Sequence, residues 1–164
     1  MWRVKSSSIH GTGVFATCKI NKGTKIIQYI GEKVKRSEGD KRSEKRLKKY
    51  LNSEEDGSVY IFELNSKYDI DGSALYNKAR YINHSCDPNC EVDIVNNEIW
   101  ISSIKGIKKG DELSYDYGFE FDKDDYKDHI CKCESKNCIG YIISSDDWNK
   151  FKKHISKIIK RKNR

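Results

Sequence analysis

The chain has 164 residues, a length that predicts one compact domain. Lys and Arg total 32 against 25 Asp and Glu, so the net charge is +7, and the charged fraction of 35% exceeds the roughly 25% of average proteins. Only 36% of the residues are hydrophobic, but ten Tyr and three Trp supply large core side chains, and the single Pro excludes Pro-rich and collagen-like chains. The composition therefore favours a polar folded domain over a disordered chain.

The sequence contains no run of about 18 apolar residues, so we expect no membrane span. Residues 1–6 also lack the apolar core of a secretory signal. We therefore expect an intracellular, reducing compartment, either cytoplasm or nucleus. In such a compartment the six Cys would be free thiols or metal ligands rather than disulfides.

In chain order, β-branched and aromatic runs broken by glycines first predict strands at 2–5, 14–16 and 26–30. The pattern then changes to one that predicts a mostly solvated helix over 33–51, with Gly39 weakening its first half. The charges of this segment are typical of a surface helix, and a basic docking element for a partner is the alternative.

Strands resume at 59–64 and 68–70. Alternating apolar residues predict a hairpin of 91–95 with 98–103, joined by Asn96-Asn97, because Asn tolerates the positive φ of a tight turn. A short strand is expected at 113–117. The chain ends in a basic helix, whose apolar face is formed by Trp148, Phe151, Ile155, Ile158 and Ile159. The fold class is therefore mainly β, with a C-terminal helix.

Three cysteines, Cys131, Cys133 and Cys138, lie within eight residues of one another. Two cysteines separated by one residue rarely form a disulfide, because disulfide geometry is narrow. Three thiolates on one loop and a fourth from elsewhere match a closed tetrahedral zinc site. The fourth ligand is left open among Cys86, Cys90 and Cys18, and free buried thiols are the alternative to a metal site.

Three other segments have the residue types of functional sites. The polar loop 80–90 contains His84 and Cys86, which could act as a nucleophilic pair only with a third orienting group that the sequence does not identify. The glycine turn at 10–15 lacks the following helix of a dinucleotide site, so any ligand there would contact the backbone. The aromatic segment 110–119 favours either core packing or a pocket for a cationic or alkyl side chain.

Taken together and in this order, the motifs resemble the SET-domain protein-lysine methyltransferases with a post-SET zinc motif. The resemblance extends over about residues 3–142. The matching segments are HGTGVFA at 10–16, YIGE at 29–32, VYIFEL at 59–64, INHSCDPNC at 82–90, GDELSYDYGF at 110–119 and CKCESKNCIGY at 131–141.

The resemblance implies a fold of small curved β-sheets around a pseudoknot, in which the segment near Tyr117 threads under the loop 83–86. It implies S-adenosylmethionine as cofactor and one structural zinc, with Cys86 as its fourth ligand and with Cys18 and Cys90 as free thiols. The implied cofactor contacts are His10, Gly11, Thr12, Gly13, Tyr60, Asn83, His84 and Lys132. Tyr117 would be the catalytic tyrosine, and Tyr115 would restrict the product mainly to mono- or dimethyl-lysine.

On this basis we expect a SET domain at 1–122, a linker and post-SET zinc loop at 123–142 and a basic helix at 143–164. The expected substrate is a lysine in a histone or another basic protein. Two other functions remain as alternatives. One is a catalytically silent module that binds lysine-containing tails, and the other is a nucleic-acid-associated protein based on the +7 charge. The oligomeric state is left open.

Overall fold

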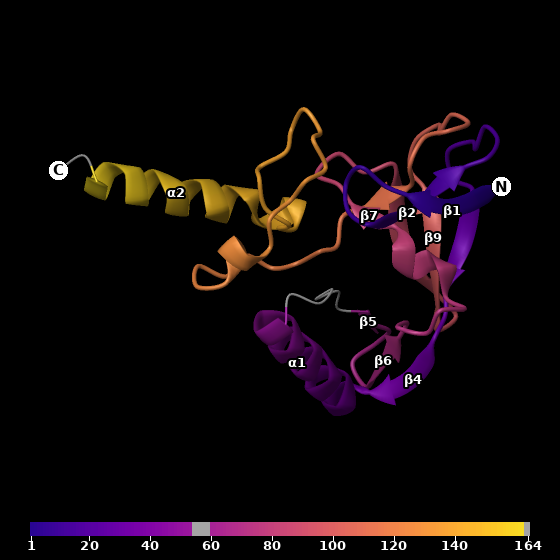
Figure 1. Ribbon diagram of the computed structural model, residues 1–164, viewed down its shortest axis with the longest axis horizontal. Coiled ribbons are helices and arrows are strands. Elements are labelled where there is room, and N and C mark those ends of the chain that lie inside the picture. Colours follow the sequence, from indigo (N-terminus) through magenta and orange to yellow (C-terminus); the bar gives the residue numbers. More distant parts are fainter. Residues whose placement is uncertain (54–59, 163–164) are drawn as a thin grey trace.

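Ten short strands in four small sheets, with two helices at the periphery, form the part of the chain that the structure describes, residues 1–53 and 60–162 of a computed structural model (Figure 1). The strands are β1 (Trp2–Ser6), β2 (Thr12–Ala16), β3 (Lys25–Tyr29), β4 (Glu32–Lys35), β5 (Ile61–Glu63), β6 (Tyr68–Asp71), β7 (Asn83–His84), β8 (Cys90–Val95), β9 (Glu98–Ser103) and β10 (Ser114–Tyr115). The helices are α1 (Arg36–Ser53) and α2 (Trp148–Lys162), and short 3-10 turns lie at Lys78–Tyr81, Tyr126–Asp128 and Ser145–Asp147. The architecture is mainly β with a C-terminal helix, as the sequence predicts.

Three of the sheets are antiparallel and the fourth is parallel. β1 pairs with β2, β9 lies between β3 and β8, and β6 lies between β4 and β5. The two-residue strands β7 and β10 pair in parallel although about thirty residues separate them. Among the described residues, neither helix is long and apolar enough to cross a membrane.

The predicted hairpin is present as β8 and β9, with Val95 opposite Glu98. The turn residues Asn96 and Asn97 have φ of 53° and 60°, the left-handed region that a two-residue hairpin loop requires. One face of β9 is completely buried through Ile99 and Ile101, which are 1% and 0% exposed. The alternation of apolar residues and the two-residue turn therefore predict the observed pairing of β8 with β9.

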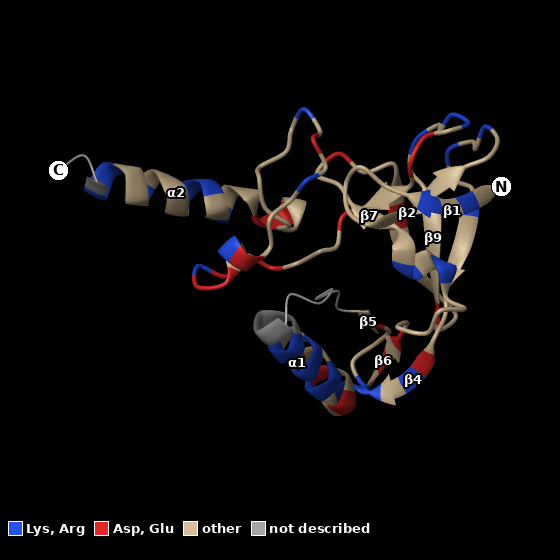
Figure 2. Ribbon diagram, viewed as in Figure 1, with Lys and Arg blue, Asp and Glu red and all other residues tan. Residues whose placement is uncertain are grey.

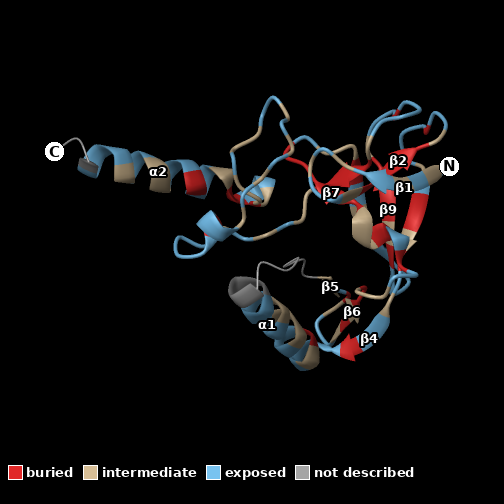
Figure 3. Ribbon diagram, in the orientation of Figure 1, coloured by how far each residue is buried: buried red, intermediate tan, exposed pale blue. Residues whose placement is uncertain are grey.

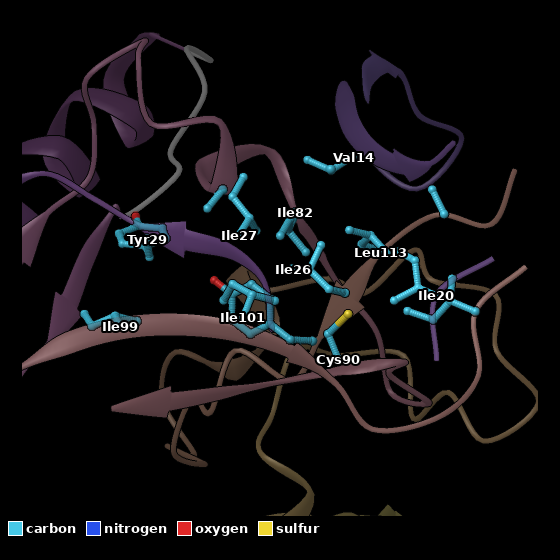
Figure 4. Packing of buried hydrophobic residues seen from close by; sticks show 14 of the residues in the cluster. Val14, Ile20, Ile26, Ile27, Tyr29, Ile82, Cys90, Ile99, Ile101 and Leu113 are labelled. Carbon is cyan, nitrogen blue, oxygen red and sulfur yellow. The ribbon is translucent and has the colours of Figure 1, made fainter. Parts of the chain in front are cut away.

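The main core lies between the small sheets (Figure 4). It contains Val14 from β2, Ile26 and Ile27 from β3, and Leu113 beside β10. A second, smaller cluster of Tyr126, Ile143 and Phe151 lies at the base of α2, against which Trp148 and Ile155 pack. Most of α2 beyond this cluster is exposed (Figure 3), and Ile159 is 54% exposed. The predicted apolar face of α2 is therefore buried only in its first half.

The structure corrects three predicted boundaries. The helix expected from residue 33 begins at Arg36, because 32–35 pair with β6 as strand β4. The strand expected at 113–117 is shortened to Ser114–Tyr115. The strand expected at 59–64 is observed as Ile61–Glu63, and residue 59 lies outside the described part of the chain.

Gly39 has a packing role in α1, where the sequence suggested only a weak point. A Cβ at this position would collide with the carboxylate of Asp69 on β6. The absence of a side chain at Gly39 therefore lets α1 approach the sheet closely.

A buried carboxylate connects α1 to the sheet β4–β6–β5. Asp71, which is 4% exposed, accepts hydrogen bonds from Arg42 Nη1 at 2.9 Å and from Arg46 Nη2 at 3.0 Å. Burial alone would raise the pKa of Asp71, but the hydrogen bonds from Arg46, Arg42 and Ser73 hold it well below the usual range. The charged carboxylate therefore stabilises the docking of the helix.

We expect Asp71→Asn to lower the free energy of unfolding by about 1–3 kcal/mol, because it removes the buried anion that Arg42 and Arg46 share, and Arg42 keeps only its exposed partners Glu32 and Glu38. We do not expect the loss of about 3–5 kcal/mol that is typical of breaking a fully buried ion pair, because the side chains of Arg42 and Arg46 are 29% and 27% exposed. A depressed carboxyl pKa contributes stability above the unfolded-state pKa of about 3.9, so the difference between wild type and variant should shrink as the pH falls below that value. Urea unfolding at pH 7 and at pH 3 measures it. Asp87→Asn, which removes an exposed partner of Lys105, is the control and should have little effect.

Candidate active site

The site is assembled by the parallel pairing of β7 with β10. Asn83 lies opposite Ser114 and His84 opposite Tyr115, and the Ser85 N–H donates to the Tyr115 carbonyl at 3.2 Å. Asn89 extends the pairing, because its side-chain amide donates to the Glu112 carbonyl at 2.7 Å and its Oδ1 accepts from the Ser114 N–H at 2.9 Å. The loop 82–90 is thereby fixed to the segment 112–117.

Asn83 also reaches the glycine turn that precedes β2. Its Nδ2 lies 3.3 Å from the His10 carbonyl and 3.2 Å from the Thr12 carbonyl. The same nitrogen lies 3.2 Å from Ser7 Oγ and 2.8 Å from Glu112 Oε1. An amide nitrogen has two hydrogens, so four oxygens here exceed what Asn83 can satisfy. The turn therefore has unused acceptor capacity, which suits a cationic donor such as an ammonium group.

Glu112 is a site residue that the sequence analysis missed. Its two carboxylate oxygens accept from Ser7 Oγ at 2.8 and 2.9 Å, and one of them also accepts from Asn83. The structure also explains Gly13, because a Cβ at this position would collide with the Glu112 carboxylate. A single acidic residue in a Gly-Asp-Glu turn gives no periodic or spacing signal, so only the fold reveals its position.

His84 is buried at 3% exposure between Tyr117 and Cys86. Its Nδ1 accepts the backbone N–H of Tyr117 at 3.2 Å, which assigns the ring proton to Nε2. Nε2 lies 3.6 Å from Cys86 Sγ. Burial lowers the pKa of His84, so the neutral ring is favoured, although Asp116 partly opposes this. His84 therefore connects the backbone at Tyr117 to the sulfur of Cys86.

Tyr117 is held at both its backbone and its side chain. Its hydroxyl donates to the Ile82 carbonyl at 3.0 Å, and its ring meets the His84 ring edge-on with centroids 5.4 Å apart. The Tyr115 ring lies 5.0 Å away, and Tyr115 is 7% exposed. Burial raises the pKa of Tyr115 well above its usual value, so its hydroxyl stays protonated.

The two tyrosines belong to a longer series of aromatic rings. Each ring contacts the next at centroid distances of 5.0 to 6.1 Å, in the order Tyr29, Phe62, Tyr115, Tyr117, Phe119 and His129. These rings come from β3, β5, β10 and the chain that follows β10. The rings are tilted or edge-on to one another, and aromatic rings grouped in this way suit a cationic or alkyl group, as the sequence analysis considered for 110–119.

Two expected cofactor residues lie differently from the others. The Arg80 guanidinium carbon lies 3.9 Å from the centroid of the Tyr60 ring. The backbone carbonyl of Tyr60 accepts a hydrogen bond from the Tyr29 hydroxyl at 2.9 Å. Lys132 lies on the cysteine loop. The structure thus brings Asn83 together with His10 and Thr12, and His84 together with Tyr117. The ring of Tyr60 contacts Arg80.

A possible metal site is formed by Cys86, Cys131, Cys133 and Cys138, whose Sγ atoms all lie within 4.8 Å of one another. Cys86 Sγ is 3.8 Å from Cys131 Sγ and 3.9 Å from Cys138 Sγ. A tetrahedral zinc with Zn–S bonds of about 2.3 Å has sulfur atoms about 3.8 Å apart. The spacing therefore fits a tetrahedral ion, and Cys86 completes the cluster in preference to Cys90 or Cys18.

The surroundings of the four sulfurs favour thiolates at some positions. Burial raises the pKa of the Cys86 and Cys131 thiols. Burial acts the same way at Cys133, but the Cys86 N–H and hydrogen bonds from Ser135 outweigh it and lower the pKa of Cys133 to about 6. The Gly140 N–H points to Cys138 Sγ at 3.4 Å. Backbone N–H groups directed at sulfur are the surroundings that a thiolate ligand needs.

The remaining cysteines lie apart from the cluster. Cys90 is 1% exposed in the main core, where burial raises the pKa of its thiol to about 12, and Cys18 is exposed. The sequence analysis also considered Cys86 and His84 as a nucleophilic pair. The two groups do touch, but Cys86 Sγ also lies among three other sulfurs, as a metal ligand would.

Comparison with known proteins gives one family match and many relatives. The model of the SET domain matches residues 11–118. The chain is 35% identical over 144 residues to the "Histone-lysine N-methyltransferase, H3 lysine-4 specific" of Emericella nidulans, which covers 85% of this chain and 11% of the relative. It is 39% identical over 136 residues to human "Histone-lysine N-methyltransferase 2D", covering 80% and 2%. The H3 lysine-4 specific enzyme of Saccharomyces cerevisiae is 35% identical over 140 residues, covering 83% and 12%. The chain therefore spans only a small part of the length of these relatives.

Proposed function

Because the chain belongs to the SET-domain family, we propose that it is a protein-lysine N-methyltransferase that uses S-adenosylmethionine and acts on a histone. The observation that carries the proposal is the meeting of Asn83 and His84 with Tyr115 and Tyr117 through the parallel pair of β7 and β10. A histone substrate would place the protein at chromatin. The first substrate to test is the tail of histone H3 with its lysine-4, for which two of the relatives are named.

The turn at 10–13 suits the amino-acid end of S-adenosylmethionine, which carries an ammonium group. The surplus acceptors around Asn83 Nδ2, the His10 and Thr12 carbonyls, would bind that ammonium. Gly11 has φ of +43° and no neighbour within 4 Å of a Cβ position, so the backbone leaves room for a ligand there. When bound, S-adenosylmethionine supplies an electrophilic methyl group.

The remaining chemistry belongs to the chain's own side chains. A lysine amine with a pKa of about 10.4 is mostly protonated at pH 7, and only its neutral form is a nucleophile. The aromatic rings around Tyr115 and Tyr117 would enclose the lysine side chain and exclude water, which lowers the pKa of the amine. They would also align its nitrogen for in-line attack. Tyr117, held by the Ile82 carbonyl and by its own backbone bond to His84, would orient the transferring group.

The cysteine cluster would hold one structural zinc as a post-SET site. Its Cys86 ligand follows His84 by two residues, and His84 Nε2 contacts that sulfur. The ion would therefore fix both the loop 131–138 and the position of His84 beside Tyr117, because metal binding and local folding are coupled.

We expect about one zinc per chain in the purified wild type and close to none in Cys131→Ser, because three sulfurs and a hydroxyl bind zinc far more weakly than four thiolates. Elemental analysis by mass spectrometry measures the ratio. Cys18→Ser removes an exposed thiol outside the cluster and serves as the control, with the zinc content unchanged. Folded, active wild type without zinc would contradict the assignment.

Tyr117→Phe should lower the rate of lysine methylation by at least about 10²-fold, the usual loss when one preorganised transition-state group is removed. Mass spectrometry of an H3 peptide incubated with the labelled cofactor gives the rate. Tyr126→Phe removes a hydroxyl from the separate cluster at the base of α2 and should keep the wild-type rate. Near-wild-type activity of a folded Tyr117→Phe variant would refute the role. A wild type that binds cofactor and peptide without forming product would instead support the silent binding module.

We further propose that Tyr115 limits the product mainly to mono- and dimethyl-lysine. Its buried, protonated hydroxyl could hold a water beside the lysine nitrogen, in the space that a further methyl group would need. Tyr115→Phe should therefore shift the product toward trimethyl-lysine without abolishing activity, by roughly five- to thirty-fold in the product ratio for a preference of about 1–2 kcal/mol. The distribution of methylated peptides gives the answer, again with Tyr126→Phe as control. Trimethyl-lysine as the main product of the wild type would contradict this role.

A further inference from the structure

The net positive charge of the chain lies entirely in its last segment. Residues 148–164 contain eight Lys and Arg and no Asp or Glu. The remaining 147 residues contain 24 Lys and Arg against 25 Asp and Glu, a net charge of −1. The +7 of the whole chain is therefore the sum of +8 on α2 and the residues after it and −1 on the rest, and α2 lies outside the residues 11–118 that match the SET-domain family.

Four of these eight cations lie on one face of α2. Trp148, Phe151 and Ile155 pack on the second core cluster, and the helix then extends away from the sheets (Figures 1 and 2). The other side is a shallow, fully exposed depression, here called the lysine face, which is lined by Asn149, Lys152, Lys153, Ser156, Lys157 and Lys160. Their spacing of three and four residues places all six on one side of the helix.

The lysine face of α2 differs from the other basic helix, α1, in its ion pairs. On α1, Arg42 pairs with Glu32, Glu38 and Asp71, and Lys48 pairs with Glu44. On α2, Lys150 pairs with Asp147 at the start of the helix. Within the described residues, no carboxylate lies at ion-pair distance from the four lysines of the lysine face. Several cations of α1 are thus paired within the domain, whereas the four lysines of the lysine face are available to an external anion.

We propose that the lysine face binds the phosphate backbone of duplex DNA. The inference rests on the proposed function, because the DNA that carries histones would be next to a histone substrate. Lys153 and Lys160 are about 10.5 Å apart along the axis at 1.5 Å per residue, and a duplex presents one phosphate per about 1.7 Å of its axis. Lys153, Lys157 and Lys160 can therefore contact separate phosphates, independently of base sequence.

A histone tail and an anionic membrane fit the lysine face less well than DNA does. A histone tail is itself basic, so the lysine face would repel it. An anionic membrane would require an apolar face free to insert, but Trp148, Phe151 and Ile155 are packed on the domain. Only Ile158 and Ile159 continue that face beyond the packed part.

The test is the salt dependence of DNA binding by the full chain. Fluorescence anisotropy with a labelled duplex of about 25 base pairs gives the binding constant from about 50 to 200 mM salt. The triple variant Lys153→Gln, Lys157→Gln, Lys160→Gln should bind more weakly, and the slope of log K against log salt should become shallower by about 3, or about 0.9 for each phosphate that is no longer neutralised. Gln is a good helix former, so α2 should remain intact.

The matched control is Lys19→Gln, Lys22→Gln, Lys109→Gln, which removes the same charge from exposed positions outside α2. It should keep most of the wild-type slope. Equal slopes for the two triple variants would overturn the proposal, because the binding would then follow net charge alone. Absence of DNA binding by the wild type would overturn it as well, including a result in which the wild type binds vesicles containing phosphatidylserine but no DNA. Weaker binding of an H3 peptide by the α2 variant, with DNA binding unchanged, would overturn it in favour of direct substrate docking.

Methylation assays separate this inference from the proposed function. The α2 variant should methylate a free H3 peptide at the wild-type rate and should lose rate on reconstituted nucleosomes at about 150 mM salt. A wild type without methyltransferase activity, but with the expected difference in slope, would refute the proposed function and leave DNA binding supported. Normal peptide methylation, with equal salt slopes for the two triple variants, would support the proposed function and refute DNA binding by the lysine face.

Discussion

The pairing of two residues in β7 with two residues in β10 is the constraint on which the rest of the candidate site depends. This parallel contact is short, and it is reinforced by further hydrogen bonds between the same segments, among them those of Asn89, His84 and the Tyr117 hydroxyl. Each bond joins residues 82–90 to residues 112–117. Because these segments are distant in the chain, the entropy of closing the loop between them must be offset by the whole set of bonds together. The position of Tyr117 is therefore fixed by all of these hydrogen bonds together and not by any single contact.

The loop 82–90 also connects the three parts of the site. Asn83 contacts the glycine turn, His84 contacts the backbone of Tyr117, and Cys86 belongs to the cysteine cluster. These residues lie within four positions of one another, so a shift of the loop would move all three contacts at once. The turn, the aromatic rings and a metal at the cysteines would accordingly be coupled through the backbone of this loop. This gives a physical reason for a structural metal to affect a distant tyrosine.

The sequence predicts local features of this fold better than long-range ones. The β8–β9 hairpin and its Asn96-Asn97 turn follow from alternation and from the φ preference of Asn, and the cysteine cluster follows from spacing and the family resemblance. The predicted start of α1 was wrong because 32–35 become a strand only by pairing with β6, a contact that helical spacing cannot reveal. Glu112 was missed for the same reason, since its role comes from Ser7, which lies 105 positions earlier in the chain. Local propensity is overridden where a distant partner satisfies the backbone or the side chain.

The two regions with functional proposals depend on different forces. The bonds around Asn83, His84 and Tyr117 are short contacts in buried or half-buried surroundings, which dissolved salt screens little. The lysine face of α2 is fully exposed, and any attraction to phosphate there is long-range and weakened by salt. The chain before α2 has almost no net charge, so its attraction to a polyanion would come from α2 and not from the surface around the site. Docking and methyl transfer would then be separable by ionic strength: moderate salt would release DNA from the helix while the arrangement of Tyr117 and His84 stays intact.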